Sequence, residues 1–153
     1  MTGRPLAPSL SVGYGDLQAA RERIAEDVVL TPCPRAAAFN DLTDGKLYLK
    51  FESLQRTGSF KDRGSLNRML HLTDEERRRG VVTASAGNHA QAVAYHAARL
   101  GIPCTVVMPE GAPLIKVMNT RAYGAKVILH GFVLDDSAEE AWRLVEEEGR
   151  TMV

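Results

Sequence analysis

Lys61 lies in a stretch of sequence that could make its amine a nucleophile. The stretch places an aromatic residue beside the lysine and a glycine on each side of the pair, in the order Thr57-Gly58-Ser59-Phe60-Lys61-Asp62-Arg63-Gly64. A lysine amine that is partly withdrawn from water loses its proton more readily, and it can then attack an aldehyde to form a Schiff base. The pattern therefore predicts a lysine nucleophile. The alternative for any single lysine is a solvated position on a helix.

A second stretch, Ser85-Ala86-Gly87-Asn88-His89, has the composition of an anion-binding turn. It follows an apolar run at residues 81–84 and precedes an alanine-rich segment, which indicates a strand that leads into a helix. Backbone N–H groups at a helix start point towards an anion, and Gly87 would let a ligand approach the backbone closely. The turn therefore predicts a cradle for a carboxylate or a phosphate. A helix cap without a ligand would fit the same residues.

The N-terminal elements must position the lysine. We expect a flexible leader over residues 1–15 and a helix over residues 16–28, with Asp16 as its N-cap, ended by the prolines at 32 and 34. A turn at residues 43–46 and a strand over residues 46–51 should follow. The next predicted helix covers residues 59–70, so that Lys61 lies near its beginning.

From residue 73 onward, strands and helices alternate regularly. A capping-box pattern at Thr73 opens a short helix that ends at Gly80. Strands are expected at residues 81–84, 104–108 and 126–129 and from residue 151, and helices at 88–100, 113–123 and 136–148. This order predicts the α/β class, with an open parallel sheet between two helix layers in a three-layer αβα arrangement.

Two separate motifs occur in the order typical of one enzyme class. They are Ser59-Phe60-Lys61-x-Arg63-Gly64 and Ser85-x-Gly87-Asn88-His89-x-Gln91. The chain resembles the fold-type II pyridoxal-phosphate enzymes, with a tryptophan synthase β-like fold. It is most similar to the threonine dehydratase (threonine ammonia-lyase) family, which is close to serine dehydratase and serine racemase. The resemblance runs from about Leu30 to the last residue, with support at residues 51–55, 107–109 and 123–127.

This resemblance implies a role for each motif residue. Lys61 would hold pyridoxal 5′-phosphate and take the α-proton, Phe60 would abut one face of the cofactor ring, and Asn88 would contact its 3′ oxygen. The substrate carboxylate would bind to the loop made of Ser85, Ala86, Gly87, Asn88 and His89. Ser85 could also relay a proton on the face opposite Lys61.

The implied reaction is the deamination of L-threonine or L-serine by β-elimination, which gives a 2-oxo acid and ammonia. The family also implies a small amino-acid substrate and a place in amino-acid metabolism, including isoleucine biosynthesis. Two alternatives remain open. One is serine racemase-like chemistry, and the other is a truncated module without catalytic activity. Arg63 and Gln91 are given structural roles, and Arg63 could form an ion pair with Asp62 or Glu52.

Composition excludes several other classes of function. The 153 residues carry 19 basic and 19 acidic side chains, so no overall charge favours a nucleic acid or a membrane. Cys33 and Cys104 have no metal-ligand spacing, which predicts no metal site and a reducing, cytoplasmic location. His71, His96 and His130 belong to no motif. We expect each to lie on the surface or to be a hydrogen-bonded core residue.

The glycines indicate what the sequence lacks. The family has a run of glycines that binds the cofactor phosphate, whereas no two of the 13 glycines here are adjacent. The chain is therefore expected to be an N-terminal portion. Residues 1–70 would be an incomplete part of the large cofactor domain, and residues 71–153 the small α/β domain. We expect this chain alone to be inactive and its uncovered apolar surface to favour a homo-oligomer.

Overall fold

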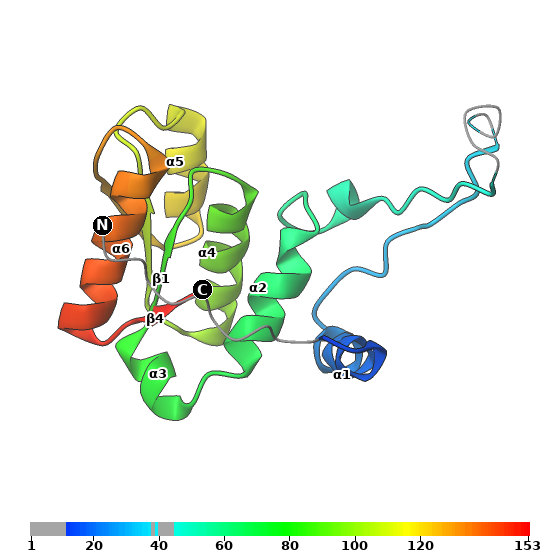
Figure 1. Ribbon diagram of the computed structural model, residues 1–153, viewed down its shortest axis with the longest axis horizontal. Helices are drawn as coiled ribbons and strands as arrows, with labels where there is room; N and C mark the ends of the chain where they lie inside the picture. Colours follow the sequence, from blue (N-terminus) through cyan, green and yellow to red (C-terminus); the bar gives the residue numbers. More distant parts are fainter. Residues whose placement is uncertain (1–11, 38, 40–44) are drawn as a thin grey trace.

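The fold is built on a four-stranded parallel sheet in the order β3-β2-β1-β4. Residues 12–37, 39 and 45–153 are described in the computed structural model of the protein (Figure 1). The strands are β1 (Val81–Ala84), β2 (Cys104–Met108), β3 (Lys126–Leu129) and β4 (Thr151–Met152). Their neighbouring pairs are all parallel, with Val81 opposite Cys104 and Thr151, and Thr105 opposite Lys126. The predicted open parallel sheet is confirmed.

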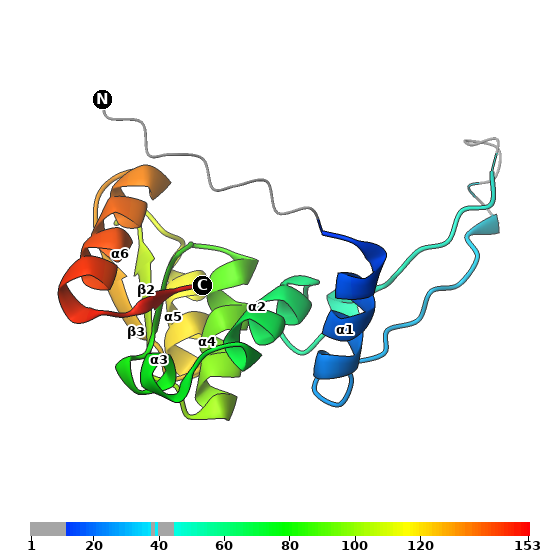
Figure 2. The ribbon, with the colours of Figure 1, turned by 60° about the horizontal axis from the view of Figure 1, so that its bottom comes forward.

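Helices cover both faces of this sheet because successive side chains of its strands enter apolar clusters on opposite faces. On one face, Val106 and Met108 pack against α4 (Asn88–Leu100) and α5 (Leu114–Ala122). On the other face, Val82 and Val107 pack against α6 (Leu134–Glu148). Figure 2 shows α6 on one side of the strands, with α4 and α5 on the other. The three-layer arrangement agrees with the expected one.

The helix that begins at the candidate lysine belongs to the same packed unit. Helix α2 (Lys61–Leu70) lies beside α4 in both views, and its Leu66 and Met69 are fully buried (Figures 1 and 2). Met69 joins a cluster with Val81 of β1 and Val93 of α4. Helix α3 (Asp74–Arg79) connects α2 to β1 and begins with the predicted capping box between Thr73 and Glu76.

The first helix differs from its predicted bounds. Helix α1 covers Tyr14–Ile24, so it begins and ends earlier than the expected 16–28. Asp16 is not the N-cap. It is the third helical residue, and its carboxylate accepts the Gly13 N–H at 2.8 Å. After the helix, the side-chain amide of Gln55 binds both the N–H and the C=O of Val29 at 3.0 and 2.9 Å. These two hydrogen bonds fix the backbone of Val29, the residue that follows the predicted helix.

The prediction of a strand at residues 46–51 is wrong. The structure has only an isolated antiparallel bridge there, between Arg35 and Tyr48. The Leu49 and Phe51 N–H groups donate to the carbonyls of two prolines at residues 34 and 32, both at 3.1 Å. Proline has no N–H to donate in return, so a regular ladder cannot form. A 3₁₀ turn, η2 (Glu52–Leu54), then leads towards α2. Residues 1–11 of the predicted leader and residues 43–44 of the predicted turn lie outside the described residues, whereas residues 14 and 15 belong to α1.

Candidate active site

Lys61 is the first residue of α2, and its side chain is half-buried. Its amine lies 5.0 Å from the centre of the Phe60 ring, and that ring is 61% exposed. The Lys61 N–H donates to the hydroxyl of Ser59 at 3.3 Å, and its carbonyl accepts the hydroxyl of Ser65 at 2.7 Å. The backbone of the lysine is therefore fixed on both sides, while an aromatic face remains open beside its amine.

An ion pair holds the loop before Lys61 against α2. The guanidinium of Arg63 binds the carboxylate of Glu52 in a bidentate manner, at 2.7 and 2.9 Å. Thr31 donates a further hydrogen bond to Glu52 at 2.6 Å. The Arg63 hydrogen bonds lower the pKa of Glu52 to about 2, although burial of the carboxyl opposes the shift. Of the two partners considered for Arg63, the structure selects Glu52.

The loop from Ser85 to His89 joins the end of β1 to the start of α4. The Ser85 N–H donates to the Val107 carbonyl on β2 at 3.1 Å, and the Ser85 hydroxyl accepts the Gly87 N–H at 3.2 Å. Asn88 opens a helix of 13 residues and is exposed. The N-terminal end of a helix this long favours an anion.

Gly87 leaves an open space at this helix start. A Cβ atom built on it would meet no other part of the described chain within 4 Å. Its φ of −129° lies outside the left-handed region that favours glycine. The side chain of His89 is engaged elsewhere, because its Nε2 lies 3.0 Å from the Val153 carbonyl beyond β4.

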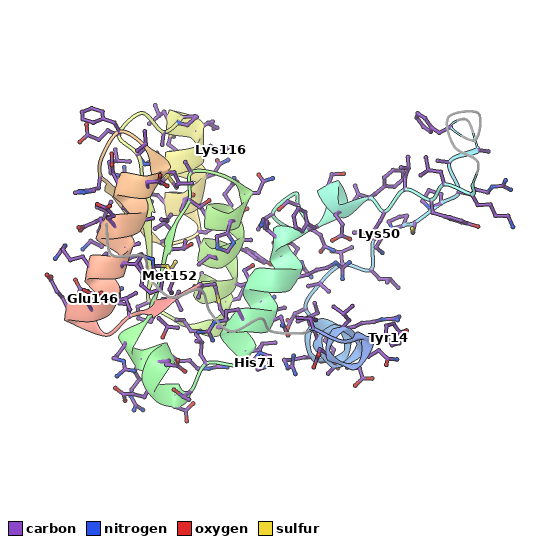
Figure 3. The ribbon with its side chains drawn as sticks, viewed as in Figure 1. Tyr14, Lys50, His71, Lys116, Glu146 and Met152 are labelled. Carbon is purple, nitrogen blue, oxygen red and sulfur yellow. The ribbon has the colours of Figure 1, made fainter. Side chains whose placement is uncertain are left out.

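The two motifs come from helices that pack side by side. Lys61 begins α2 and the Ser85–His89 loop begins α4, and the two helices lie side by side (Figure 1). Asp62 of α2 lies 3.6 Å from His96 of α4. Lys50, by contrast, lies on the extended segment away from the sheet and donates to the Thr31 carbonyl (Figure 3). Glu146 lies on α6, on the side of the sheet opposite α4. The acidic residues 146–148 are all exposed.

One polar pair at this site was missed from the sequence. The side chain of His96 is fully buried, and its Nε2 lies 3.6 Å from the carboxylate of Asp62, which is also buried. The expectation of a surface or hydrogen-bonded histidine is wrong, because neither ring nitrogen has a hydrogen-bond partner within the described residues. No local spacing could have linked the two residues, since they lie on different helices.

These residues fit an aromatic aldehyde that also carries an anionic group. Lys61 supplies an amine, Phe60 an open aromatic face, and the start of α4 a set of backbone N–H groups beside open space. Within residues 12–37, 39 and 45–153, no group of histidine, cysteine and acidic side chains could hold a metal ion. No helix in the same residues is long and apolar enough to cross a bilayer.

Comparison with known proteins decides the family. Residues 24–153 match the family described as pyridoxal-phosphate dependent enzymes. The chain belongs to this family. It is 48% identical over 138 residues to an L-threonine ammonia-lyase of Thermotoga maritima, which covers 90% of the chain and 34% of that relative. It is 46% identical over 144 residues to the catabolic L-threonine dehydratase TdcB of Escherichia coli K12, which covers 94% of the chain and 44% of that protein.

Solved structures of fold-type II enzymes share this arrangement. Serine racemase from Dictyostelium discoideum superposes with a TM-score of 0.82 at 37% identity, over 91% of this chain and 45% of that one. The processed form of threonine deaminase isoform 2 from Solanum lycopersicum superposes with a TM-score of 0.81 at 35% identity, over 93% of this chain and 40% of that one. The chain thus spans less than half the length of each of these relatives.

Proposed function

We propose that this chain acts within a longer polypeptide, of the relatives' length, that deaminates L-threonine, or L-serine, to a 2-oxo acid and ammonia. The observation that carries the proposal is the placement of Lys61, half-buried beside an exposed aromatic face on a helix that packs against the anion-binding helix. The relatives named threonine ammonia-lyase and threonine dehydratase, at 48% and 46% identity, support the same substrate class.

In this proposal the chain contributes the lysine that holds the cofactor and the loop that binds the substrate carboxylate. Lys61 would hold the cofactor through its amine and would accept the α-proton of the substrate. The loop of Ser85, Ala86, Gly87, Asn88 and His89 binds the substrate carboxylate and orients the Cα–H bond. Phe60 packs against the cofactor ring, and Asn88 contacts its 3′ oxygen. When bound, pyridoxal phosphate supplies an electron sink for the pair that the α-proton leaves behind, so that the β-hydroxyl can depart.

We further propose that residues 1–70 are part of the large cofactor domain and that residues 71–153 form the small domain. Apolar side chains on the extended segment support a separate N-terminal part, although helix α2, the last element of that part, packs against α4. Tyr48, Leu49, Phe51 and Leu54 are each 37–55% exposed, and a larger domain or a second copy of the chain would cover them. Assembly as a homo-oligomer, a cytoplasmic location and a role in amino-acid metabolism, including isoleucine biosynthesis, belong to the same proposal.

The second candidate function is serine racemisation. It is favoured by the likeness to serine racemase and by the half-buried position of Ser85 at the end of β1, from which its hydroxyl could return a proton. The chirality of serine left after partial turnover separates the two reactions, because elimination alone leaves the residual serine in the L form. A Ser85→Ala variant should lose more racemisation than elimination.

The test of the main proposal is a deamination assay with L-threonine in the longer polypeptide. Lys61→Ala should abolish 2-oxo acid formation and the visible absorbance of the lysine-bound cofactor together. Lys61→Arg should not restore either, because a guanidinium stays protonated and cannot act as the nucleophile. Lys126→Ala, at an exposed position on β3, is the matched control and should keep both. An active Lys61→Ala variant would refute the proposal. Activity of the 153-residue chain alone decides whether it is a catalytically silent module.

A further inference from the structure

His96 is a buried polar side chain whose position requires an explanation. It is fully buried on α4, and both of its ring nitrogens lack hydrogen-bond partners within the described residues. Leaving a buried polar group unpaired costs free energy, so such groups are rare in folded proteins. The polar atom facing it from α2 is Oδ1 of Asp62, 3.6 Å from its Nε2. A shift of about half an ångström would make this contact a normal hydrogen bond.

Asp62 closes a short loop around Lys61. Its side chain is 1% exposed, and its carboxylate accepts the Thr57 N–H at 3.2 Å and also the Thr57 hydroxyl. Thr57 precedes Lys61 and Asp62 follows it, so these two hydrogen bonds tie together the chain on both sides of the lysine. Gly58, with φ of +75°, makes the turn inside this loop.

The charge of Asp62 makes its partner important. Burial raises the pKa of Asp62, but the contacts with His96 and Thr57 outweigh burial and bring the pKa below its ordinary value. A buried ionised carboxylate is stable only while donors surround it. The structure supplies such donors from the Thr57 loop, and the His96 ring faces the carboxylate from α4.

We propose that the buried Asp62–His96 pair, closed by Thr57, positions Lys61 relative to the anion-binding loop. The pair links the first turn of α2, where Lys61 lies, to α4, whose N-terminus carries the Ser85–His89 loop. Neither side chain touches the proposed substrate, so both are positioning residues. The inference rests on the proposed role of Lys61 and adds the contact that holds the lysine helix against the carboxylate-binding helix.

The test measures how fast Lys61 reacts with pyridoxal 5′-phosphate in the 153-residue chain. Borohydride traps the product, and trypsin then releases labelled Lys61 in peptide 57–63, because the modified lysine is not cleaved. The rate at which the exposed Lys126 is labelled in the same sample is the internal standard. It corrects for the reagent concentration and for the intrinsic reactivity of a lysine amine. Circular dichroism confirms that each variant is folded at the temperature of the assay.

Four single variants and one double variant separate a positioning role from a loss of folding. His96→Leu removes the donor and should slow Lys61 labelling by about tenfold or more, since displacing a reacting group by about 1 Å can cost up to about 100-fold. His96→Gln keeps an N–H close to the position of Nε2 and should recover most of the rate. Asp62→Asn should slow labelling, and adding His96→Leu to it should cost little more, because the pair is already broken. Asp136→Asn, which removes another carboxylate that accepts backbone N–H groups at a helix start, should leave the rate unchanged.

The outcomes distinguish this inference from the function on which it rests. If wild-type Lys61 reacts no faster than Lys126, the positioning role fails, whereas the role of Lys61 in the longer polypeptide is decided by the deamination assay with Lys61→Ala. If wild-type Lys61 reacts faster but His96→Leu and Asp62→Asn match it while folded, only the positioning role is overturned. The two single substitutions act independently if the double variant loses labelling rate by the product of their separate factors. That result would also overturn the proposed pair, because two substitutions that break the same contact do not add.

Discussion

Gly87 allows ligand binding to be tested separately from folding. A Cβ atom at this position would meet no described atom within 4 Å, and the φ of −129° lies outside the left-handed region that favours glycine. Gly87 is the N-cap of α4, so we predict that Gly87→Val leaves the 153-residue chain folded and lowers its free energy of unfolding by no more than about 1–2 kcal/mol. In the longer polypeptide, the branched side chain should fill the space for the substrate carboxylate and raise KM for L-threonine at least about tenfold. Cofactor absorbance should persist. Unaltered kinetics would show that the turn is only a helix cap.

Glu52 gives the residue-scale prediction for pH. Its pKa is about 2 in the folded chain against an ordinary value of 4.5, because Arg63 binds the carboxylate. A depressed folded pKa contributes stability above the unfolded pKa, and this contribution is lost as the pH falls from about 4.5 towards 2. Glu52→Gln should therefore destabilise the chain by roughly 1–3 kcal/mol at neutral pH, with partial exposure favouring the lower end.

Denaturant unfolding across pH 2–7 measures this effect. The difference between wild type and Glu52→Gln should be constant above about pH 5 and should narrow as the solution is acidified. Glu146→Gln, at an exposed position on α6, controls for the change in net charge. A difference that stays the same down to pH 2 would contradict the proposed contribution of the ion pair.

At the residue scale, motifs that are continuous in the sequence could be predicted, whereas contacts between distant residues could not. The Lys61 and Ser85–His89 stretches could be found because each is continuous in the sequence. The Glu52–Arg63 pair was one of two options, and geometry was needed to choose between them. The Asp62–His96 contact could not be predicted, because the packing of α2 on α4 brings the two residues together.

At the scale of elements, sequence predicted the sheet unit well and the N-terminal part poorly. Strands β1 to β3 and helix α4 have their expected bounds, because apolar runs, helix-stopping glycines and buried strands indicate the same boundaries. Helices α1 and α6 both begin two residues early. Asp16 was expected to be the N-cap of α1, and residue 136 the first residue of α6. Each aspartate is instead the third residue of its helix, where its carboxylate accepts a backbone N–H from a residue before the helix.

Gly80 and Gly101 form a matched pair that tests the turn before β1. Both have positive φ, +89° and +66°, but a Cβ at Gly80 would lie 2.5 Å from the Pro103 carbonyl oxygen, whereas one at Gly101 would meet nothing within 4 Å. Gly101→Ala should cost only the left-handed backbone penalty of roughly 1–2 kcal/mol. Gly80→Ala adds a clash with the backbone and should cost about 3 kcal/mol or more. Urea unfolding measures both, and equal losses would contradict the close approach of Gly80 to Pro103.

At the scale of the whole molecule, the described chain has a well-packed sheet unit and a sparsely packed N-terminal part. Val81, Val82, Val93 and Val106 are fully buried, whereas residues 45–51 make few regular hydrogen bonds. Amide hydrogen exchange in the 153-residue chain should therefore protect β1, β2 and α4 at least about 100-fold more than residues 28–37 and 45–51. Equal protection of the two parts would contradict this picture.

Borohydride trapping in the longer polypeptide tests the central claim most directly, namely that Lys61 is the lysine that holds the cofactor. Reduction converts a lysine–pyridoxal phosphate linkage into a stable amine, and tryptic mass mapping then locates it. We predict a phosphopyridoxyl group on peptide 57–63, present once per chain and absent after Lys61→Ala. A label found instead on Lys50, Lys116 or another lysine, with peptide 57–63 unmodified, would contradict the account.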